Sequence, residues 1–305
     1  MCRKFPKGVY PVMLTPFTED DHVDYEALER LIEWYISQGA AGLFAVCQSS
    51  EMFFLSLEER VGISRFVKEK AAGRVPVVSS GHVSDSLKDQ AEELTAIAST
   101  GADAVILLTN RLARECDDDD IWLDNLKKLL EMIPDDVPLG FYECPYPYKR
   151  VISPKLLRWC AETGRFYFIK DTSCSLENIK AKLEVIRGTE LQLYNANTST
   201  LLESLEMGAA GYSGVMANFH PRLYAELCDS YAKDRERMRG LADFLTIASF
   251  IERQVYPVNA KFYQRQIGNF SGIHTRSKDT DLFNATCVLE TQQLIRLTDA
   301  VEKIY

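Results

Sequence analysis

Short apolar runs alternate with amphipathic segments over the first two-thirds of the chain. Each run has the length of a buried strand, and the segments between them carry apolar residues at the three- and four-residue spacing of a helix with one buried face. The segment that begins at Asp24, for example, places Leu28, Leu31, Ile32 and Tyr35 on one side. The strands predicted in this way cover residues 9–17, 42–47, 76–81, 104–109, 139–144, 166–170, 191–196 and 211–215.

Local residues mark several of the predicted helix starts. Ser56 stands three residues before Glu59, the capping-box spacing in which each side chain bonds the backbone N–H of the other residue. Ser153 followed by Pro154 is typical of an N-cap and a first helical residue. The acidic run 117–120 is predicted to cap another helix, because anions suit the positive end of the helix dipole. A metal role is disfavoured there, since consecutive helical residues do not converge on one point.

Eight strand–helix units within about 230 residues predict a closed (β/α)8 TIM barrel, which belongs to the α/β class. The competing fold is an open, doubly wound sheet. It would be favoured by a Gly-x-Gly-x-x-Gly turn after the first strand, and residues 15–18 offer none. After Pro221 the strand pattern stops, and helices are predicted at 223–232, 235–254 and 286–305. The predicted domains are a barrel over residues 1–221 and a helical extension over 222–305 that packs on the barrel.

Composition and charge limit the classes of partner. The 305 residues are 46% hydrophobic and 26% charged, as is usual for a soluble globular protein. The net charge of −9 disfavours binding to nucleic-acid phosphates or to an anionic membrane surface. No uninterrupted apolar stretch is long enough for a transmembrane helix. We therefore expect a small-molecule partner, with no nucleic acid and no membrane.

The cysteines and histidines change this picture little. None of the eight cysteines forms a Cys-x-x-Cys pair, and the four histidines lack metal-binding spacings, so no metal is predicted. The first seven residues are basic but have no apolar core behind them, unlike a signal peptide. Reduced thiols and a cytoplasmic location are expected.

The strongest candidate for chemistry is Lys170, which ends the apolar run 166–170. The carboxyl end of such a strand is where α/β enzymes keep their reactive groups. A lysine that is partly desolvated there has a lowered pKa, and its neutral amine can attack a carbonyl. The alternative is a solvated lysine at a strand end, which is the commoner situation for a lysine considered alone.

Two other strand ends carry groups that fit the same chemistry. Ser49 and Ser50 offer hydroxyls and turn amides that can hold a carboxylate, and Tyr142 offers a phenol that can pass protons. Each residue also has an ordinary structural interpretation, as a helix cap or a core aromatic. Together on one face of a barrel, they predict a site that forms an imine with a 2-oxo acid.

Five motifs occur in a characteristic order along the chain. They are residues 10–17, residues 48–51 followed by 55–60, Phe141-Tyr142 with Pro145, Ile169-Lys170-Asp171 with Ser173, and residues 211–215 with Asn218 and Pro221. In these motifs, and in the separation between Tyr142 and Lys170, the chain resembles the dihydrodipicolinate synthase and N-acetylneuraminate lyase family of Schiff-base lyases. The resemblance extends from about Lys7 to Pro221.

The resemblance implies a role for each site residue. Lys170 would form the imine, Tyr142 would relay protons, and Ser49 and Ser50 would bind the substrate carboxylate. Ser213 lies where the family lines its pocket with a backbone carbonyl. The catalytic residues are thus predicted to be Lys170, Tyr142 and Ser49, and the substrate-binding residues to be Gln48, Ser50, Ser213 and Asn197. No metal or organic cofactor is required, and a homo-oligomer, dimer or tetramer, is implied.

Three departures from the family pattern bear on the substrate. Residues 47–51 lack the two glycines of the family's usual carboxylate loop. Pro147 occupies the position where the synthases have an arginine for the second substrate, and Leu112 stands where they have a second tyrosine. We therefore expect a lyase or aldolase that cleaves or forms a carbon–carbon bond of a sugar-derived 2-oxo acid. The alternatives are a dihydrodipicolinate synthase, using pyruvate and aspartate semialdehyde, and a non-catalytic barrel that binds a 2-oxo acid.

Overall fold

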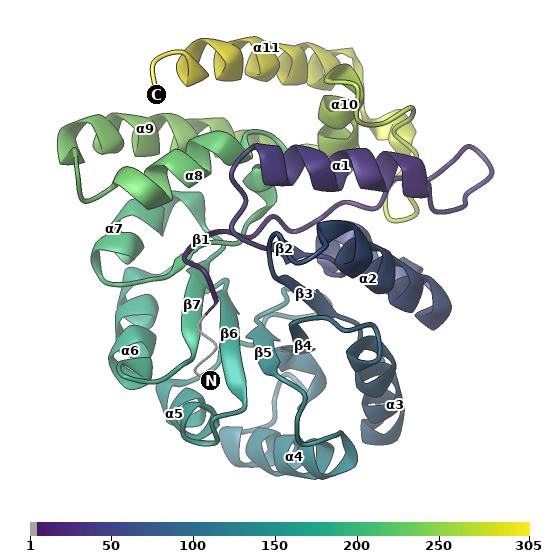
Figure 1. Cartoon of the computed structure of the whole chain (residues 1–305), viewed down its shortest axis with the longest axis vertical. Coiled ribbons are helices and arrows are strands. Elements are labelled where there is room, and N and C mark those ends of the chain that lie inside the picture. The colour runs from purple at the N-terminus through teal and green to yellow at the C-terminus, as the bar shows by residue number, and fades with distance from the viewer. Residues whose placement is uncertain (1–4) are drawn as a thin grey trace.

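The structure is a computed structural model that describes residues 5–305, and it has eight parallel strands surrounded by helices (Figure 1). The basic start of the chain, including Cys2, lies outside the described residues. The strands are β1 (Gly8–Val9), β2 (Leu43–Phe44), β3 (Val77–Ser80), β4 (Ala104–Leu108), β5 (Leu139–Tyr142), β6 (Phe166–Asp171), β7 (Gln192–Asn195) and β8 (Gly211–Tyr212). Each lies within or beside a run predicted from the sequence.

Helices follow the strands in alternation. They are α1 (Tyr25–Ser37), α2 (Leu57–Ala71), α3 (Leu87–Ala98), α4 (Asp119–Met132), α5 (Pro154–Glu162), α6 (Leu176–Ile186), α7 (Leu201–Glu206), α8 (Pro221–Ser230), α9 (Arg235–Ala248), α10 (Val258–Gln266) and α11 (Ala285–Glu302). No helix among residues 5–305 is long and apolar enough to cross a membrane.

The sheet closes on itself. The hydrogen-bonded strand order is β1-β8-β7-β6-β5-β4-β3-β2, and every pair is parallel. The segment after β1 completes the ring, because Phe44 donates its N–H to the Pro11 carbonyl and accepts from the Met13 N–H, both at 3.0 Å. At the β1–β8 seam, a side chain at Gly211 would overlap the backbone of Gly8, so the close approach requires glycine. The predicted (β/α)8 TIM barrel is confirmed.

Aromatic rings fill the barrel interior below the predicted site. The Phe168 and Tyr194 rings stack with centroids 4.4 Å apart, and Tyr10 lies 4.7 Å from Tyr194. Phe168 and Lys170 are two residues apart on β6, so their side chains point to the same face of the strand. This aromatic layer forms a dry floor, and Lys170 stands directly above it.

The predicted helix starts are confirmed by their hydrogen bonds. The Ser56 and Glu59 side chains form the reciprocal capping box, and Ser153 caps α5 with Pro154 at the first helical position. Within the acidic run, Asp118 caps α4 by accepting from the N–H groups of residues 120 and 121. These local signals fixed the helix starts because they satisfy backbone donors that would otherwise be unpaired.

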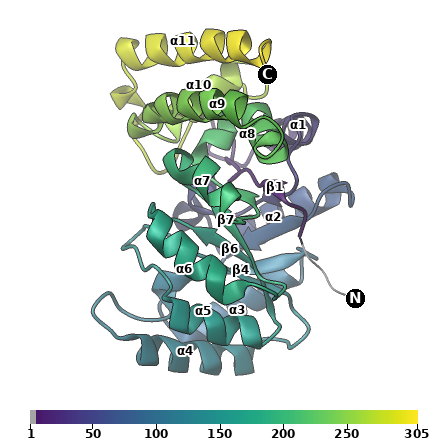
Figure 2. The same cartoon turned by 90° about the vertical axis from the view of Figure 1, so that its left-hand side faces the viewer.

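The C-terminal helices α9, α10 and α11 gather on one side of the barrel, beyond α8 (Figures 1 and 2). The predicted helix 235–254 is too long: α9 ends at Ala248, and a 3-10 turn follows over Ser249–Arg253. The side chain of Asn259 donates to the Ile251 carbonyl at 2.8 Å, which gives that turn a partner from α10 in place of a further helical turn. The division of the chain at residue 221 stays a prediction.

Candidate active site

A cavity of about 440 Å³ opens at the carboxyl ends of the strands. Five of the seven predicted site residues line it: Gln48, Ser49, Tyr142, Lys170 and Asn197. They come from four different strand ends that are far apart in the sequence. The barrel therefore brings together groups that the sequence alone could only assign to strand ends.

Lys170 is a buried amine without a counter-ion. Its side chain is 4% exposed, and no carboxylate among residues 5–305 forms an ion pair with it. Its nitrogen lies over the ring of Tyr142, 4.2 Å from the centroid. Burial lowers the pKa of Lys170 to about 8, against smaller opposing effects of Cys47, Cys144 and Glu252.

The neighbouring Cys144 thiol does not supply a charge at neutral pH. Burial raises the pKa of the Cys144 thiol to about 11, so it stays protonated beside the amine. The aromatic ring faces of Tyr142 and Phe44 lie close to the Lys170 nitrogen and attract its protonated form. Such an interaction is weaker than an ion pair, which is consistent with a lowered pKa.

The adjacent carboxylate of Asp171 serves another purpose. It points to the other face of β6, where it accepts hydrogen bonds from the Ser173 N–H and hydroxyl and pairs with Lys182 at 2.5 Å. Lys182 also pairs with Glu143, and Glu143 accepts from the Thr172 N–H at 2.9 Å. This buried group joins the carboxyl ends of β5 and β6 and keeps both carboxylates away from Lys170. Glu143 does not line the cavity.

Tyr142 is the register partner of Lys170 on the neighbouring strand. Its hydroxyl donates to the side-chain oxygen of Gln48 at 3.3 Å. Burial raises the pKa of Tyr142 well above its usual value, so the phenol is protonated at neutral pH. Gln48 thus orients the phenol of Tyr142 in addition to lining the cavity.

The loop over residues 47–51 folds without the glycines that the family usually has there. Cys47 is extended (φ −154°), and Ser50 is not among the residues with positive φ; the left-handed position in this loop is Glu51 (φ 62°). The Ser50 hydroxyl accepts from the Cys47 N–H at 3.0 Å and lies 2.8 Å from the carbonyl oxygens of Met13 and Ala45. Ser50 therefore stabilises the loop, and its hydroxyl does not line the cavity.

Ser49 belongs to a second chain of polar contacts. Its hydroxyl forms a hydrogen bond with the phenol of Tyr256, and that phenol accepts from the Asn218 side chain at 3.0 Å. Asn218 is in turn bonded to the Tyr35 hydroxyl. Tyr256 lines the cavity, although no sequence pattern pointed to it. It comes from the connection between α9 and α10, so only the folded chain places it there.

The remaining two predicted residues differ in their orientation. Asn197 lines the cavity, and its side-chain oxygen caps the next turn by accepting from the Thr200 N–H at 3.1 Å. Ser213 is fully buried, and its hydroxyl donates to the Tyr10 carbonyl at 3.0 Å, away from the cavity. The backbone after Ser213 reaches the cavity instead, at Gly214 and Val215.

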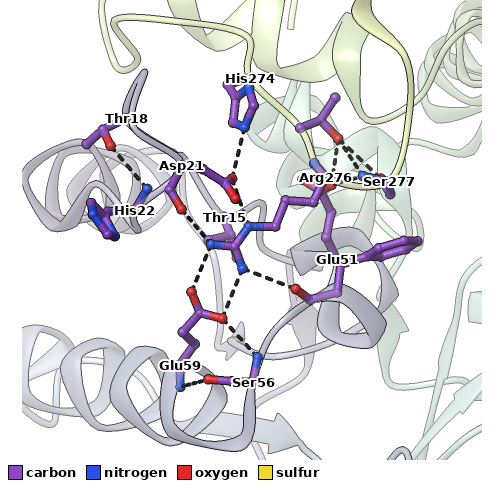
Figure 3. A network of polar contacts seen from close by, with 12 residues as sticks. Thr15, Thr18, Asp21, His22, Glu51, Ser56, Glu59, His274, Arg276 and Ser277 are labelled. Carbon is purple, nitrogen blue, oxygen red and sulfur yellow. Dashed lines mark hydrogen bonds and ion pairs between the residues drawn. The ribbon is translucent and has the colours of Figure 1, made fainter.

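Glu51 anchors a C-terminal segment, residues 274–278, across the strand ends. Its carboxylate pairs with Lys261 at 2.5 Å and accepts from the Thr275 hydroxyl and the Ser277 N–H. Arg276, within the same segment, forms a two-pronged ion pair with Glu59 at the start of α2 and also bonds Asp21 (Figure 3). These contacts hold Ser277 and Lys278 in the cavity wall.

The outer part of the cavity contains residues that the sequence did not identify as a set. Lys149 reaches it and donates to the Thr172 carbonyl at 2.8 Å, although Pro147 occupies the position expected for an arginine. Arg150 turns away and bonds the backbone around the start of α4. Lys278 and Glu252 complete the charged groups of this region. The sequence signal for a cation in the outer cavity was the pair of basic residues after Pro147. That signal did not show that Lys149, and not Arg150, lines the cavity.

Comparison with known proteins assigns the family. The family model described as the dihydrodipicolinate synthetase family matches residues 5–290. The chain belongs to this family. The prediction of a class I, lyase- or aldolase-type enzyme is thereby confirmed.

Several named proteins are similar to the chain over most of its length. A 4-hydroxy-tetrahydrodipicolinate synthase of Clostridium perfringens is 28% identical over 261 residues, which cover 83% of this chain and 86% of the relative. A crystal structure of a dihydrodipicolinate synthase from Acinetobacter baumannii, complexed with pyruvate, is 23% identical. It has a TM-score of 0.85 and covers 97% of this chain and 99% of its own. The synthase from Cyanidioschyzon merolae with lysine bound is 19% identical, with a TM-score of 0.87 and 97% and 99% coverage.

The two lysines of the site region make a matched stability test. Lys170 and Lys261 are both buried, and burial lowers the pKa of each to about 8, but only Lys261 has a carboxylate partner. We expect Lys170→Met to stabilise the protein by roughly 1–3 kcal/mol, because it removes an unpaired buried charge. Lys261→Met should destabilise it by about 3–5 kcal/mol, because Glu51 would be left buried without its counter-ion.

The measurement is the urea midpoint of each variant at pH 7 and one protein concentration. The folded-state pKa of Lys170 is below its unfolded value of 10.5, so the destabilisation by its charge is complete below pH 8 and disappears as the pH rises towards 10.5. The gain from Lys170→Met should shrink over the same range. Equal destabilisation by the two substitutions would contradict the unpaired state of Lys170.

Proposed function

We propose that the protein is a lyase or aldolase that acts on a 2-oxo acid through a Schiff base on Lys170. The observation that carries this proposal is the buried, unpaired amine of Lys170 on the face of the Tyr142 ring. With a pKa of about 8, roughly one-tenth of the amine is neutral at pH 7, against about 0.03% at a pKa of 10.5. The environment thus raises the concentration of the nucleophile about 300-fold.

The reaction would begin when the neutral amine attacks the 2-oxo carbonyl and water leaves, giving a protonated imine. In cleavage, the C4 hydroxyl loses its proton and becomes a carbonyl, the C3–C4 bond breaks, and its electron pair moves through C3 towards the iminium nitrogen to leave an enamine; bond formation runs the same steps in reverse. Tyr142, protonated and oriented by Gln48, is suited to pass a proton at these steps. The substrate carboxylate would meet the Ser49 hydroxyl and the backbone of the turn Gln48–Ser50.

We propose a sugar-derived 2-oxo acid as the substrate. The cavity beyond Lys170 is lined by polar groups, including Asn197, Thr172, Ser277 and Glu252, which suit a hydroxylated chain. Leu112 is a buried apolar side chain with no hydroxyl, so it offers no second proton relay of the kind expected for a synthase. The Ser213 hydroxyl bonds the Tyr10 carbonyl and does not reach this wall. Any contact of Ser213 with the substrate would therefore be made by the backbone at and after this residue.

Dihydrodipicolinate synthase activity is the second candidate. Lys149 lines the cavity and offers a cation for the carboxylate of aspartate semialdehyde, which Pro147 could not. The names of the curated relatives support the same activity. A non-catalytic barrel that binds a 2-oxo acid is the third candidate, and steady-state turnover distinguishes it from both enzymes.

We further propose that the protein acts in the cytoplasm as a homo-oligomer, a dimer or tetramer. Large apolar side chains are exposed on the C-terminal helices, among them Ile247 on α9 and Leu289 and Leu297 on α11. Apolar groups exposed in this way are typical of surfaces that contact another chain.

Trapping the imine tests the Schiff base directly. Incubation with pyruvate and borohydride should add one reduced pyruvate unit, detected by intact mass and peptide mapping at Lys170. The initial rate should rise with pH through about 8 and then level off, because the neutral amine is the nucleophile.

Lys170→Ala and Lys170→Arg should both abolish the adduct, since a guanidinium stays protonated. Lys149→Ala is the matched control, because it removes a different lysine of the same cavity and should keep the adduct. An adduct of equal yield in Lys170→Ala would exclude the proposed mechanism.

Tyr142→Phe tests the proton relay. The substitution keeps the ring beneath the Lys170 nitrogen and removes only the hydroxyl. Turnover should fall by roughly two to four orders of magnitude, the usual contribution of a positioned acid–base group, while the circular dichroism spectrum is unchanged. Unchanged turnover would assign the proton transfer to another group, such as Ser49.

A comparison of catalytic efficiencies tests the substrate. Cleavage of hydroxylated 2-oxo acids should be more efficient than condensation of pyruvate with aspartate semialdehyde, because a site that bonds hydroxyls discriminates strongly against substrates lacking them. Efficient condensation without lyase activity would reverse this ranking. In that case, Lys149→Met should remove the condensation and so identify the cation responsible.

A further inference from the structure

Glu252 is a cavity carboxylate that has no partner in the described chain. It lies in the 3-10 turn Ser249–Arg253 and lines the same cavity as Lys170. Among residues 5–305 it has neither a hydrogen bond nor an ion pair from its side chain. Its neighbour Arg253 does not pair with it, because that guanidinium lies on the Phe250 ring, 4.5 Å from the centroid.

The other carboxylate in the cavity lining is fully engaged. Glu51 bonds Lys261, Thr275 and the backbone of Arg276 and Ser277. Of the lining residues, Glu252 is therefore the carboxylate that can accept hydrogen bonds from a ligand.

The turn that carries Glu252 is held in place from α10. The Asn259 side chain donates to the Ile251 carbonyl at 2.8 Å, and Asn259 itself is fully buried. Tyr256, from the same connection, is fixed against Ser49 and Asn218. Its backbone is anchored on both sides, so ligand binding would have to order only the Glu252 side chain.

Glu252 also acts electrostatically on the groups at the strand ends. Its charge raises the pKa of Lys170 and contributes to the raised pKa of Tyr256. These effects fall off with distance, so the carboxylate lies within electrostatic reach of Lys170 and Tyr256 in the cavity that all three line.

We infer that Glu252 is a specificity-determining residue that binds vicinal hydroxyl groups on the distal chain of the 2-oxo acid. This inference rests on the proposed function, since the substrate is held by Lys170. A carboxylate offers two oxygens that can each accept a hydroxyl hydrogen, which fits a diol. Hydrogen bonds to a charged acceptor are also the stronger ones.

The charges of the cavity favour hydroxyls over an ammonium group as the ligand of Glu252. Lys149, Lys170 and Lys278 line the same cavity and have no carboxylate partner among the residues that the structure describes, whereas the charge of Glu51 is matched by Lys261. The lining therefore carries three unpaired cations and one unpaired anion, and a cationic substrate would be repelled. A neutral hydroxylated chain satisfies Glu252 without that repulsion.

The test compares 2-oxohexanoate with 4,5,6-trihydroxy-2-oxohexanoate, which has the same number of carbons. The concentration of each acid that gives half-maximal borohydride trapping on Lys170 is measured for the native protein and for Glu252→Gln. Intact mass separates the adduct of the whole acid from the pyruvate adduct that cleavage would leave on Lys170, and only the adduct of the whole acid is counted. We expect Glu252→Gln to raise the half-maximal trapping concentration of the trihydroxy acid at least tenfold. The half-maximal concentrations of 2-oxohexanoate and pyruvate should change by less than about twofold.

Glu236→Gln on α9 is the matched control, because it neutralises a carboxylate outside the cavity and should change none of these values. A second readout is the pH profile of pyruvate trapping. Its midpoint should move to lower pH in Glu252→Gln only, because Glu252 raises the pKa of Lys170.

Three outcomes would overturn the inference. Equal effects of Glu252→Gln on both acids would show that Glu252 does not recognise hydroxyls. If Glu252→Gln selectively weakened the trapping of 6-amino-2-oxohexanoate, the ligand of Glu252 would be a cation. Absence of any Lys170 adduct in the native protein would overturn the proposed function and this inference with it. That result differs from the first two, in which the native protein still forms the adduct.

Discussion

The site depends on one physical condition, the burial of the Lys170 ammonium without a counter-ion. An unpaired charge in the interior is unfavourable, and here the penalty appears as a pKa lowered to about 8. The aromatic layer of Phe168, Tyr194 and Tyr10 supplies the dry floor that makes the amine hard to hydrate. The same condition that weakens the folded state would provide the nucleophile of the proposed mechanism, since activity often requires a group that is unfavourable for stability.

The surrounding ion pairs maintain this condition. Asp171 is the carboxylate nearest in sequence, and its position on β6 directs it to the opposite face, where Lys182 binds it together with Glu143. Glu51 is likewise occupied by Lys261. Lys182 pairs with both Asp171 and Glu143, and Lys261 pairs with Glu51, so none of these three carboxylates is available to raise the pKa of Lys170 by direct contact. The buried pairs therefore affect Lys170 by occupying the carboxylates that could otherwise bind it, whatever their net effect on stability.

The C-terminal part of the chain completes the outer cavity. The segment 274–278 is fastened to Glu51 and, through Arg276, to Glu59 and Asp21 (Figure 3). The turn before α10 adds Tyr256 and Glu252. In the proposed mechanism, the barrel strands supply the groups for imine formation, whereas later segments shape the region where the rest of a substrate would extend. Such a division lets loops and later segments change the substrate without changing the barrel.

The sequence by itself determined the barrel, most helix starts and the identity of the groups at the strand ends. Those features depend on local chemistry: the alternation of apolar runs, the caps at Ser56 and Ser153, and a lysine placed two residues after an inward-facing Phe168. The tertiary structure alone decided which side chains face the cavity. Ser50 and Ser213 turn to backbone carbonyls, while Lys149, Glu252 and Tyr256 enter from segments without a recognisable motif. The physical reason is that orientation depends on hydrogen bonds between residues distant in the chain, as between Ser213 and Tyr10, and such pairings leave no periodic pattern in the sequence.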